Sequence, residues 1–565
     1  MSHSRPGQEW WRSAVVYQVY PRSFQDSDGD GIGDIPGVIS RLDYLHDLGV
    51  DVVWLSPVYR SPQDDNGYDI SDYEDIDPTF GTLADVDELI AQLHERGMRL
   101  VMDLVVNHTS DEHAWFVDSR TARDAEHADW YIWRDPRPGT VGGEPGAEPN
   151  NWGSFFSGSA WEWEPARGQY YLHLFSRKQP DLNWENPIVR RAVFDMMNRW
   201  LDRGVDGFRM DVINFISKDP ALPDGAVLTT GFGDGMPFFV SGPRLQEYLA
   251  EMKMQVFDPR PADYLTVGEM PDATPELAAR LTDDRSGQLS MIFQFEHVGL
   301  DHRGGKWNVG KLDLRDLKRS FARWQDALAE NGWNSLYWNN HDQPRIVSRW
   351  GNDREHWYAS ATALATVLHL QRGTPYVYQG EELGMTNLPF DDISALRDIE
   401  SINHYAAAVQ LQGQEPGAVL DALRAMGRDN ARTPMQWSAE PGAGFTSATP
   451  WIGVNPNHDR VNAATQTHDP GSVFAYYRRV IALRHEDPVV VHGDFRMLLP
   501  EDPALFAYER VLTGTRLLVV ANLSDDAAPC GLGGDELVLT NLPEAAASTG
   551  VLEPWEARIY RSTDA

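Results

Sequence analysis

The sequence predicts an α/β protein whose main body is a (β/α)8 TIM-type barrel, with a small domain inserted after the third strand and a C-terminal antiparallel β-sandwich. Short apolar, β-branched segments alternate with amphipathic helical segments from the N-terminus to about residue 487, which is the pattern of βα units. Eight such apolar segments are present, and eight is the strand number of this barrel. The alternation alone is also compatible with a larger doubly wound sheet.

Each predicted strand is a short run of apolar and β-branched residues. The eight runs occupy residues 14–20, 51–56, 99–106, 205–210, 263–269, 288–295, 334–340 and 374–380. Between them, apolar residues recur at three- and four-residue spacing, which predicts amphipathic helices. The clearest helical segments occupy residues 38–49, 84–97, 189–204 and 314–332.

Two stretches depart from this alternation. Residues 107–178 are rich in Trp, Gly, Pro and acidic residues and are too long for a plain βα loop, so we predict an inserted domain there. Residues 1–106 and 179–487 then form the barrel, in which residues 380–440 lack strand periodicity and are predicted to run over the barrel mouth. Residues 488–565 carry short strands separated by turns, which predicts the C-terminal sandwich.

Composition narrows the possible partners and compartments. The chain has 49 basic and 84 acidic residues and a net charge of −35, a field that repels nucleic acid and anionic membrane surfaces. No apolar run approaches the ~20 residues that cross a bilayer. The only cysteine, Cys530, cannot form an intrachain disulfide, and the first ten residues do not resemble a signal peptide. We therefore expect a cytoplasmic protein with no nucleic-acid or membrane partner, and the oligomeric state stays open.

Charged and polar residues gather at the ends of the predicted strands. The segments are DLVVNH at 103–108, GFRMD at 207–211, VGE at 267–269 and NNHD at 339–342. In a barrel of this kind the active site is built at the C-terminal ends of the strands. A single Asp after a strand is often a helix N-cap, but four such ends together predict a catalytic site.

These segments, in this order, resemble the conserved regions of glycoside hydrolase family 13, the α-amylase superfamily. The resemblance covers essentially the whole chain and includes residues 10–34, 64–73, 179–187 and 427–437. The motif QPDLN within the third of these is the version found in the oligo-1,6-glucosidase branch, whose members act on short saccharides. The resemblance therefore implies a glycosidase with a small oligosaccharide substrate.

The resemblance also implies the catalytic roles. Asp211 matches the nucleophile, Glu269 the general acid/base and Asp342 the third carboxylate of the family. A retaining glycosidase needs two carboxyl groups about 5 Å apart, one to attack the sugar and one to protonate the leaving oxygen. Arg209 lies two residues before Asp211, on the same face of the strand, and we expect it to keep Asp211 ionised.

Further residues match the positions that bind the terminal glucose in the family. They are Asp65, Tyr68, His108, His341 and Arg432. Asp65 and Arg432 resemble the charged pair that closes the pocket behind a terminal glucose, which makes such enzymes exo-acting. Each of these residues also has a structural alternative, such as a packed core histidine or tyrosine, or an ordinary surface ion pair.

The loop DSDGDGIGD at 26–34 places acidic side chains at alternating positions, like the first half of an EF-hand. It departs from a true EF-hand because Gly37 stands where the bidentate Glu would be. The same loop in relatives holds one calcium ion through residues that match Asp26, Asp28, Asp30, the Ile32 carbonyl and Asp34. We therefore expect a structural Ca²⁺ that takes no part in the chemistry, and no organic cofactor. An Asp/Gly turn without metal is the alternative.

The predicted function is that of a retaining, exo-acting α-glucosidase. Val212 follows the nucleophile, and in this branch Val at that position goes with α-1,6 linkages. An α-1,4-acting maltase and a hydrolase of sucrose or trehalose 6-phosphate are the alternatives. The short basic signature of the sucrose isomerases is not recognisable in residues 296–308. A different class of protein, the heavy chain of certain amino-acid transporters, shares the fold without always being catalytic, but such chains carry a membrane span and often lose the catalytic carboxylates.

Overall fold

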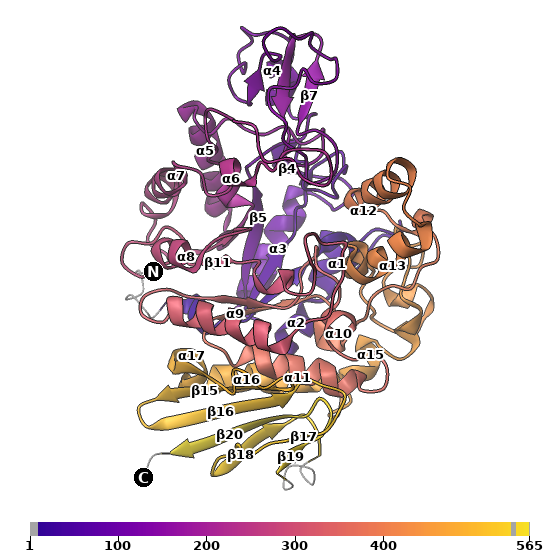
Figure 1. The fold of residues 1–565 in the computed structure, drawn as a ribbon. Coiled ribbons are helices and arrows are strands. Elements are labelled where there is room, and N and C mark those ends of the chain that lie inside the picture. The colour runs from indigo at the N-terminus through magenta and orange to yellow at the C-terminus, as the bar shows by residue number, and fades with distance from the viewer. Residues whose placement is uncertain (1–8, 544–549, 564–565) are drawn as a thin grey trace.

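In the computed structural model, which describes residues 9–543 and 550–563, the eight predicted strands form one parallel sheet (Figure 1). The order of its strands is β11-β10-β9-β5-β2-β1-β13-β12. In chain order they are β1 (Val16–Val19), β2 (Val52–Leu55), β5 (Arg99–Val105), β9 (Gly207–Asp211), β10 (Leu265–Glu269), β11 (Met291–Phe293), β12 (Ser335–Tyr337) and β13 (Thr374–Tyr378). The predicted fold class is confirmed.

The two ends of this sheet meet and nearly close the barrel. The Ser335 hydroxyl on β12 donates to the carbonyl of Ile292 on β11 at 2.6 Å, and the Tyr337 hydroxyl donates to the carbonyl of Gln294 at 2.7 Å. Side chains thus replace part of the backbone ladder between these two strands. A closed arrangement of eight parallel strands excludes the doubly wound alternative.

The predicted helices are present, but one of them is divided in two. Helix α3 (Leu83–Glu95) begins with a capping box of Thr82 and Asp85. The single helix expected at 38–49 is instead two, α1 (Ile35–Ser40) and α2 (Leu42–Leu48), which meet at Arg41. The Arg41 guanidinium donates to Gln25 and lies 4.3 Å over the ring of Trp437. These tertiary contacts accompany the break, and local periodicity does not reveal them.

The other predicted helices are present with small shifts at their ends. They are α5 (Pro187–Arg203), which begins at the Asn186 cap and ends at Gly204 with φ 117°, and α9 (Leu314–Ala327), which begins at the Asp313 cap. The observed α9 ends five residues before the predicted 332.

The long segment between β5 and α5 carries its own small sheet. Strands β6 (Trp133–Arg134), β8 (Gln169–Leu172) and β7 (Trp161–Glu164) pair antiparallel in that order, beside α4 (Ala114–Ser119). In Figure 1 this part stands at the top of the view, away from the C-terminal sheet. Its buried cluster includes Trp152 and Trp161 and continues into Val212 and Phe215, which follow β9. The insertion therefore packs directly onto the loop behind the predicted nucleophile.

The chain after β13 leaves the barrel and returns. It forms α12 (Ile399–Tyr405), α13 (Pro416–Met426) and α14 (Asp429–Arg432), followed by α16 (Val473–Glu486). In Figure 1 α12 and α13 lie to one side of the barrel, near its upper end. This excursion brings Glu400, Met426 and Arg428 to the cavity described below.

The C-terminal residues form a five-stranded antiparallel sheet under the barrel (Figure 1). Its strands, in spatial order, are β14 (Asp494–Leu498), β15 (Leu505–Leu512), β16 (Thr515–Asn522), β20 (Ala557–Thr563) and β18 (Glu536–Thr540). One face packs on α11 (Trp357–His369), where the Tyr508 hydroxyl donates to the Val367 carbonyl at 3.0 Å. The other face is covered by the small ribbon of β17 (Ala528–Pro529) and β19 (Val551–Leu552). The predicted antiparallel domain is present, but its second layer is only this short ribbon.

Among the described residues, none of the helices combines the length and the apolar character that crossing a membrane requires.

Lys318 forms hydrogen bonds that link the barrel to the C-terminal domain. It lies on α9, and its ammonium group donates to the carbonyls of Leu499, Asp502 and Leu505 at 2.5, 2.6 and 3.0 Å. The variant Lys318→Ala leaves these carbonyls without their donor, and we expect the free energy of unfolding to fall by about 2–4 kcal/mol. Denaturant unfolding measures the change. The exposed Lys311→Ala is the matched control, and an equal effect of both variants would contradict the assignment.

Candidate active site

The predicted catalytic residues lie together at the C-terminal ends of β9, β10 and β12. Asp211 is the last residue of β9, Glu269 is the last residue of β10, and Asp342 follows β12. All three line one cavity of about 340 Å³. This volume falls in the range of small-molecule sites.

One guanidinium holds three carboxylates at the base of this cavity. Arg209 Nη1 lies 2.7 Å from a carboxylate oxygen of Asp103 and 2.7 Å from one of Asp211, and its Nη2 lies 2.6 Å from one of Glu269. Parallel pairing explains the arrangement, because Arg209 on β9 stands beside Asp103 on β5 and beside Val267 on β10. The Arg209 side chain is 1% exposed, so solvent does not screen these contacts.

Asp103 belongs to the site although the sequence reasoning did not single it out. Its carboxylate is fully buried and also accepts from Trp54 Nε1 at 3.1 Å and from the Tyr68 hydroxyl at 3.0 Å. The available signal was a charged residue in the middle of the otherwise apolar run RLVMDLVV at 99–106. A buried strand carries such a residue when a partner pairs with it.

The charge balance of this cluster differs from the sequence expectation. Burial raises the pKa of Asp211, Arg209 lowers it, and the neighbouring Glu269 and Asp103 raise it again, so that it lies well above the usual value. Burial likewise raises the pKa of Asp103 to about 6 against the opposing effect of Arg209. Arg209 lowers the pKa of Asp211 in the expected direction, but its guanidinium is shared with Asp103 and Glu269 and does not offset the effect of burial.

The backbone after Asp211 contacts Glu269, the predicted acid/base. Val212 adopts φ 33° and ψ 43°, a left-handed conformation that is strained for a β-branched residue. In this conformation its N–H donates to the second carboxylate oxygen of Glu269 at 3.1 Å. Asp211 and Glu269 are thus joined twice, through Arg209 and through the Val212 backbone.

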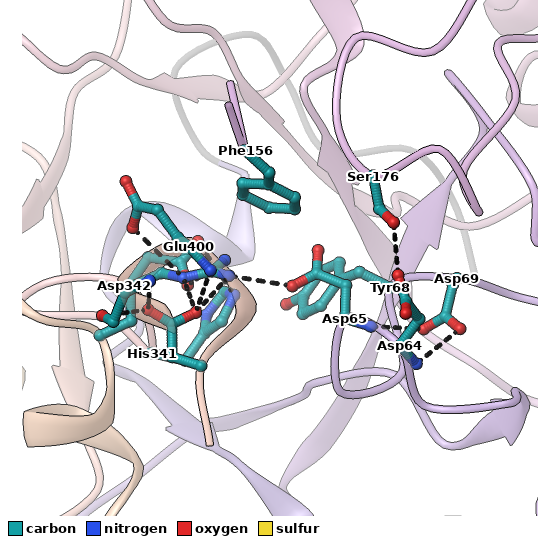
Figure 2. A network of polar contacts seen from close by, with 12 residues as sticks. Asp64, Asp65, Tyr68, Asp69, Phe156, Ser176, His341, Asp342 and Glu400 are labelled. Atoms are coloured by element: carbon teal, nitrogen blue, oxygen red, sulfur yellow. Dashed lines mark hydrogen bonds and ion pairs between the residues drawn. The ribbon is translucent and has the colours of Figure 1, made fainter. Parts of the chain in front are cut away.

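Asp342, which also lines the cavity, lies in a second network of ions (Figure 2). One carboxylate oxygen accepts from Arg432 at 2.7 Å and from Arg428 at 3.4 Å. Burial raises the pKa of Asp342, but His341, Arg428 and Arg432 together hold it well below its usual range. Asp342 is therefore ionised.

The ion pair that closes the cavity is Asp65 with Arg428, which corrects the expected pairing with Arg432. Arg428 Nη2 lies 3.0 Å from Asp65, and Gln179 donates to the other Asp65 oxygen at 3.1 Å. Arg432 is fully buried behind Asp342 and does not line the cavity. The two arginines lie one helical turn apart at α14, so the motif GRDNART offers both, and only the tertiary structure distinguishes them.

The loop that carries Asp65 is itself fixed. The Asp65 backbone N–H donates to the buried carboxylate of Asp69 at 3.0 Å, as Figure 2 shows. Burial raises the pKa of Asp65 to about 6, and Arg428 and Arg432 oppose that rise. The carboxylate is thus ionised at neutral pH and able to accept from a sugar hydroxyl.

The remaining predicted residues form one wall of the cavity. Tyr68 and His108 line it directly. His341 does not line it but stacks behind Tyr68, with 4.9 Å between ring centroids and an interplanar angle of 4°. Burial lowers the pKa of His108 to about 4 and that of His341 to about 3, so both are neutral hydrogen-bonding groups at neutral pH.

Aromatic residues that the sequence reasoning did not name complete the wall. Phe155, Phe156 and Phe175 come from the insertion, and Phe215 comes from the loop after β9. Phe156 lies 4.9 Å from the Arg428 guanidinium. Apolar faces of this kind pack against the C–H faces of a sugar ring, while the carboxylates and amides bind its hydroxyls.

The acidic loop predicted to bind calcium lies apart from the cavity lining. Carboxylate oxygens of Asp26, Asp28 and Asp34 lie within 4.8 Å of one another. Asp30 does not join this group, and its carboxylate accepts the Ile32 N–H at 2.7 Å. Asp34 also caps α1, because it accepts the Gly37 N–H at 2.6 Å. Three clustered carboxylates are a donor set that suits a hard cation.

The barrel and its site match a known family. A model described as the catalytic domain of alpha amylase matches residues 18–493. The chain belongs to the α-amylase family. It is therefore a glycoside hydrolase, as the motifs at the strand ends predict. A second model, described as a domain of unknown function, matches residues 495–559.

This α-amylase family member is similar over nearly its whole length to enzymes of different specificity. It is 52% identical to the oligo-1,6-glucosidase of Parageobacillus thermoglucosidasius, over 98% of this chain and 99% of that protein. It is 47% identical to the trehalose-6-phosphate hydrolase of Escherichia coli, over 97% of this chain and 98% of that protein. A solved structure of a mutant trehalose-6-phosphate hydrolase from Bacillus licheniformis superimposes with a TM-score of 0.91 at 45% identity, covering 98% of this chain and 100% of that one.

The shared guanidinium predicts how this enzyme responds to the loss of one carboxylate. In Asp103→Asn a negative neighbour is removed and Arg209 is left to Asp211 and Glu269, and both effects lower the pKa of Asp211. We expect the acidic limb of the kcat/KM profile to move to lower pH. The profile is measured with p-nitrophenyl α-glucoside, with the surface variant Asp87→Asn as control. A limb that stays in place or moves to higher pH would contradict the effect of Asp103 on the pKa of Asp211.

Proposed function

We propose that the protein is a retaining, exo-acting α-glucosidase that releases terminal α-linked glucose from short oligosaccharides and prefers α-1,6 linkages. The observation that carries the proposal is the cavity itself, with the Arg209 cluster at its base and the Asp65–Arg428 pair across its end. Relatives named oligo-1,6-glucosidase at about 50% identity support it.

The Arg209 cluster suits double displacement. Asp211, in its ionised form, attacks the anomeric carbon, while Glu269 gives its proton to the leaving oxygen. A glucosyl ester on Asp211 results, and Glu269 as carboxylate then takes a proton from the water that hydrolyses the ester. Asp342 stays ionised and opposes the positive charge that develops on the sugar ring.

The end of the cavity accounts for exo action. Asp65, Arg428 and Gln179 form a bonded wall, so a chain of sugars cannot continue past it. A glucose unit placed between this wall and Asp211 must be the non-reducing end of its substrate. Cleavage then releases one glucose at a time.

The preference for α-1,6 linkages rests on Val212, which lines the cavity next to the nucleophile, and on the relatives. An α-1,4-acting maltase stays the main alternative. Hydrolysis of trehalose 6-phosphate is the second, since relatives with that name are also similar. The family match does not favour the non-catalytic transporter partner. The proposed cytoplasmic location rests on the lone cysteine, Cys530.

We further propose that the acidic loop holds a structural Ca²⁺. Asp26, Asp28 and Asp34 supply the clustered oxygens, and Asp30 and the Ile32 carbonyl complete the set that the family resemblance implies. The loop precedes α1 and supplies no residue to the cavity. The ion would stabilise the fold without touching the sugar.

The division of labour between the two acids has a distinct kinetic signature. In Glu269→Gln a leaving group that needs no proton, such as fluoride in α-glucosyl fluoride, should still transfer glucose to Asp211. Added azide should then accelerate turnover and yield α-glucosyl azide, because water lacks its general base. The product is identified by NMR. In Asp211→Asn the activity should fall by several orders of magnitude on every substrate. If the azide product is β-glucosyl azide, or if azide rescues only Asp211→Asn, the roles of the two residues are exchanged.

Substrate preference tests the proposed linkage. The wild-type enzyme should hydrolyse isomaltose faster than maltose, and Val212→Thr should shift the ratio of their kcat/KM values toward maltose by an amount worth about 1–3 kcal/mol. The cause is the changed shape and polarity beside the leaving sugar. Steady-state kinetics on both disaccharides gives the ratio. An unchanged ratio would place the linkage preference elsewhere, for example in residues 107–178.

Calcium removal tests the acidic loop. Prolonged chelation should lower the melting temperature of the wild-type enzyme by a few degrees, and added Ca²⁺ should restore it, because binding to the folded state alone stabilises that state. The variant Asp28→Asn should lose this response, whereas the exposed Asp47→Asn should keep it. Identical melting curves of the wild-type enzyme with and without chelator would argue against a calcium site.

A further inference from the structure

One buried carboxylate, that of Asp69, holds together the loop that carries Asp65. Asp69 is fully buried, and its two oxygens accept three hydrogen bonds from this loop. The donors are the Asp64 N–H at 2.8 Å, the Asp65 N–H at 3.0 Å and the Ser61 hydroxyl at 3.0 Å. Burial raises the pKa of Asp69 to about 7, and these donors, rather than a cation, oppose the rise. The loop is therefore organised around a carboxylate that depends on hydrogen bonds alone.

The backbone between these donors and Asp69 is strained. Gln63 has φ 66°, Asn66 has φ 50° and Gly67 has φ 103°, so three of five consecutive residues adopt left-handed conformations. The cost falls mainly on Gln63, because Asn and Gly enter this region more readily. Strain of this kind persists only where the surrounding contacts enforce it. The hydrogen bonds to Asp69 bridge the strained positions and supply such contacts.

The same loop meets both segments that surround the pocket. The Asp64 carboxylate accepts the hydroxyl of Ser176, which belongs to the insertion, as Figure 2 shows. The Asp65 carboxylate lies 3.0 Å from Arg428 of the excursion after β13. Asp65 and Arg428 line the cavity, whereas Asp69 does not. Any effect of Asp69 on a bound sugar must therefore pass through the loop.

We propose that Asp69 is a positioning residue for the glucose pocket, which holds the strained loop so that Asp65 stays against Arg428, and which thereby sets the affinity for the terminal glucose. This inference rests on the proposed function. Both oxygens of the carboxylate are needed, because an Asn side chain offers one acceptor oxygen and places an NH2 group where a donor already lies. In Asp69→Asn at least one buried donor then loses its acceptor. The loop relaxes toward a less strained backbone, and Asp65 moves away from Arg428.

The test measures binding of 1-deoxynojirimycin, which has the size and hydroxyl pattern of one glucose. Calorimetry is done with the full-length enzyme at pH 8, where the Asp69 carboxyl is ionised. Asp69→Asn should weaken binding by at least about tenfold, and Ser61→Ala, which removes one donor and keeps the carboxylate, by a smaller factor. In p-nitrophenyl α-glucoside hydrolysis Asp69→Asn should raise KM by a similar factor and change kcat by less than about threefold, because the wall binds glucose before and during the reaction alike.

A double-mutant cycle shows whether Asp69 acts through Asp65. Asp65→Asn alone should weaken binding, and Asp69→Asn added to it should weaken binding little further. Asp283→Asn is the matched control, since Asp283 accepts the same kinds of donor from its own loop but lies outside the cavity lining. Its donors are the Arg285 N–H at 3.0 Å and the N–H and hydroxyl of Ser286, each at 2.8 Å. This control should bind the inhibitor like the wild type, and melting curves show that each variant is folded.

The inference is overturned if Asp69→Asn binds the inhibitor like the wild type, if its loss persists in full in the Asp65→Asn background, or if Asp283→Asn causes an equal loss. If Asp69→Asn does not fold, Ser61→Ala, alone and combined with Asp65→Asn, decides by the same criteria. Isomaltose hydrolysis separates this failure from that of the proposed function. If the wild type hydrolyses isomaltose and the variants do not respond, only the role of Asp69 is wrong. If the wild type hydrolyses neither isomaltose nor p-nitrophenyl α-glucoside, the proposed function itself fails.

Discussion

The shared guanidinium of Arg209 is the interaction on which the site depends. Its partners Asp103, Asp211 and Glu269 stand on three neighbouring strands, and only a parallel sheet in the observed register brings them to one point. Buried charges of this kind are stable only as a set, because removing one partner leaves another uncompensated. The cluster therefore links the fold to the proposed chemistry, because the register of the barrel strands also brings Asp211 and Glu269 to one guanidinium.

The segments outside the barrel decide what that chemistry acts on. The insertion supplies the aromatic wall and packs behind Val212, and the excursion after β13 supplies Arg428 and Glu400. These parts are tied to one another, since Phe156 of the insertion lies against Arg428 of the excursion. The barrel thus carries the acids on rigid strands, and the longer connections determine the depth and charge of the pocket, as is general for this architecture.

The barrel could be predicted from the sequence because each strand is a short apolar, β-branched run that is buried in the structure, and these runs need no tertiary information to be found. The division between α1 and α2 at Arg41 could not be predicted in this way, because it is accompanied by tertiary contacts of Arg41 with Gln25 and Trp437. In the site, Asp211, Glu269 and Asp342 follow from motifs at strand ends. The choice between Arg428 and Arg432 does not follow from the sequence, because both residues stand in one motif. The direction of the pKa shift of Asp211 does not follow from it either, because that shift depends on how many carboxylates surround Arg209.

Identification of the residue that bonds to the sugar tests the central claim most directly. A slow substrate such as 5-fluoro-α-glucosyl fluoride should trap the glucosyl-enzyme, and mass spectrometry of its proteolytic peptides locates the label. We predict a single label on Asp211, at the end of β9 beside Arg209. A label on Glu269 or Asp342, or turnover with no covalent intermediate, would contradict the roles assigned to the cluster.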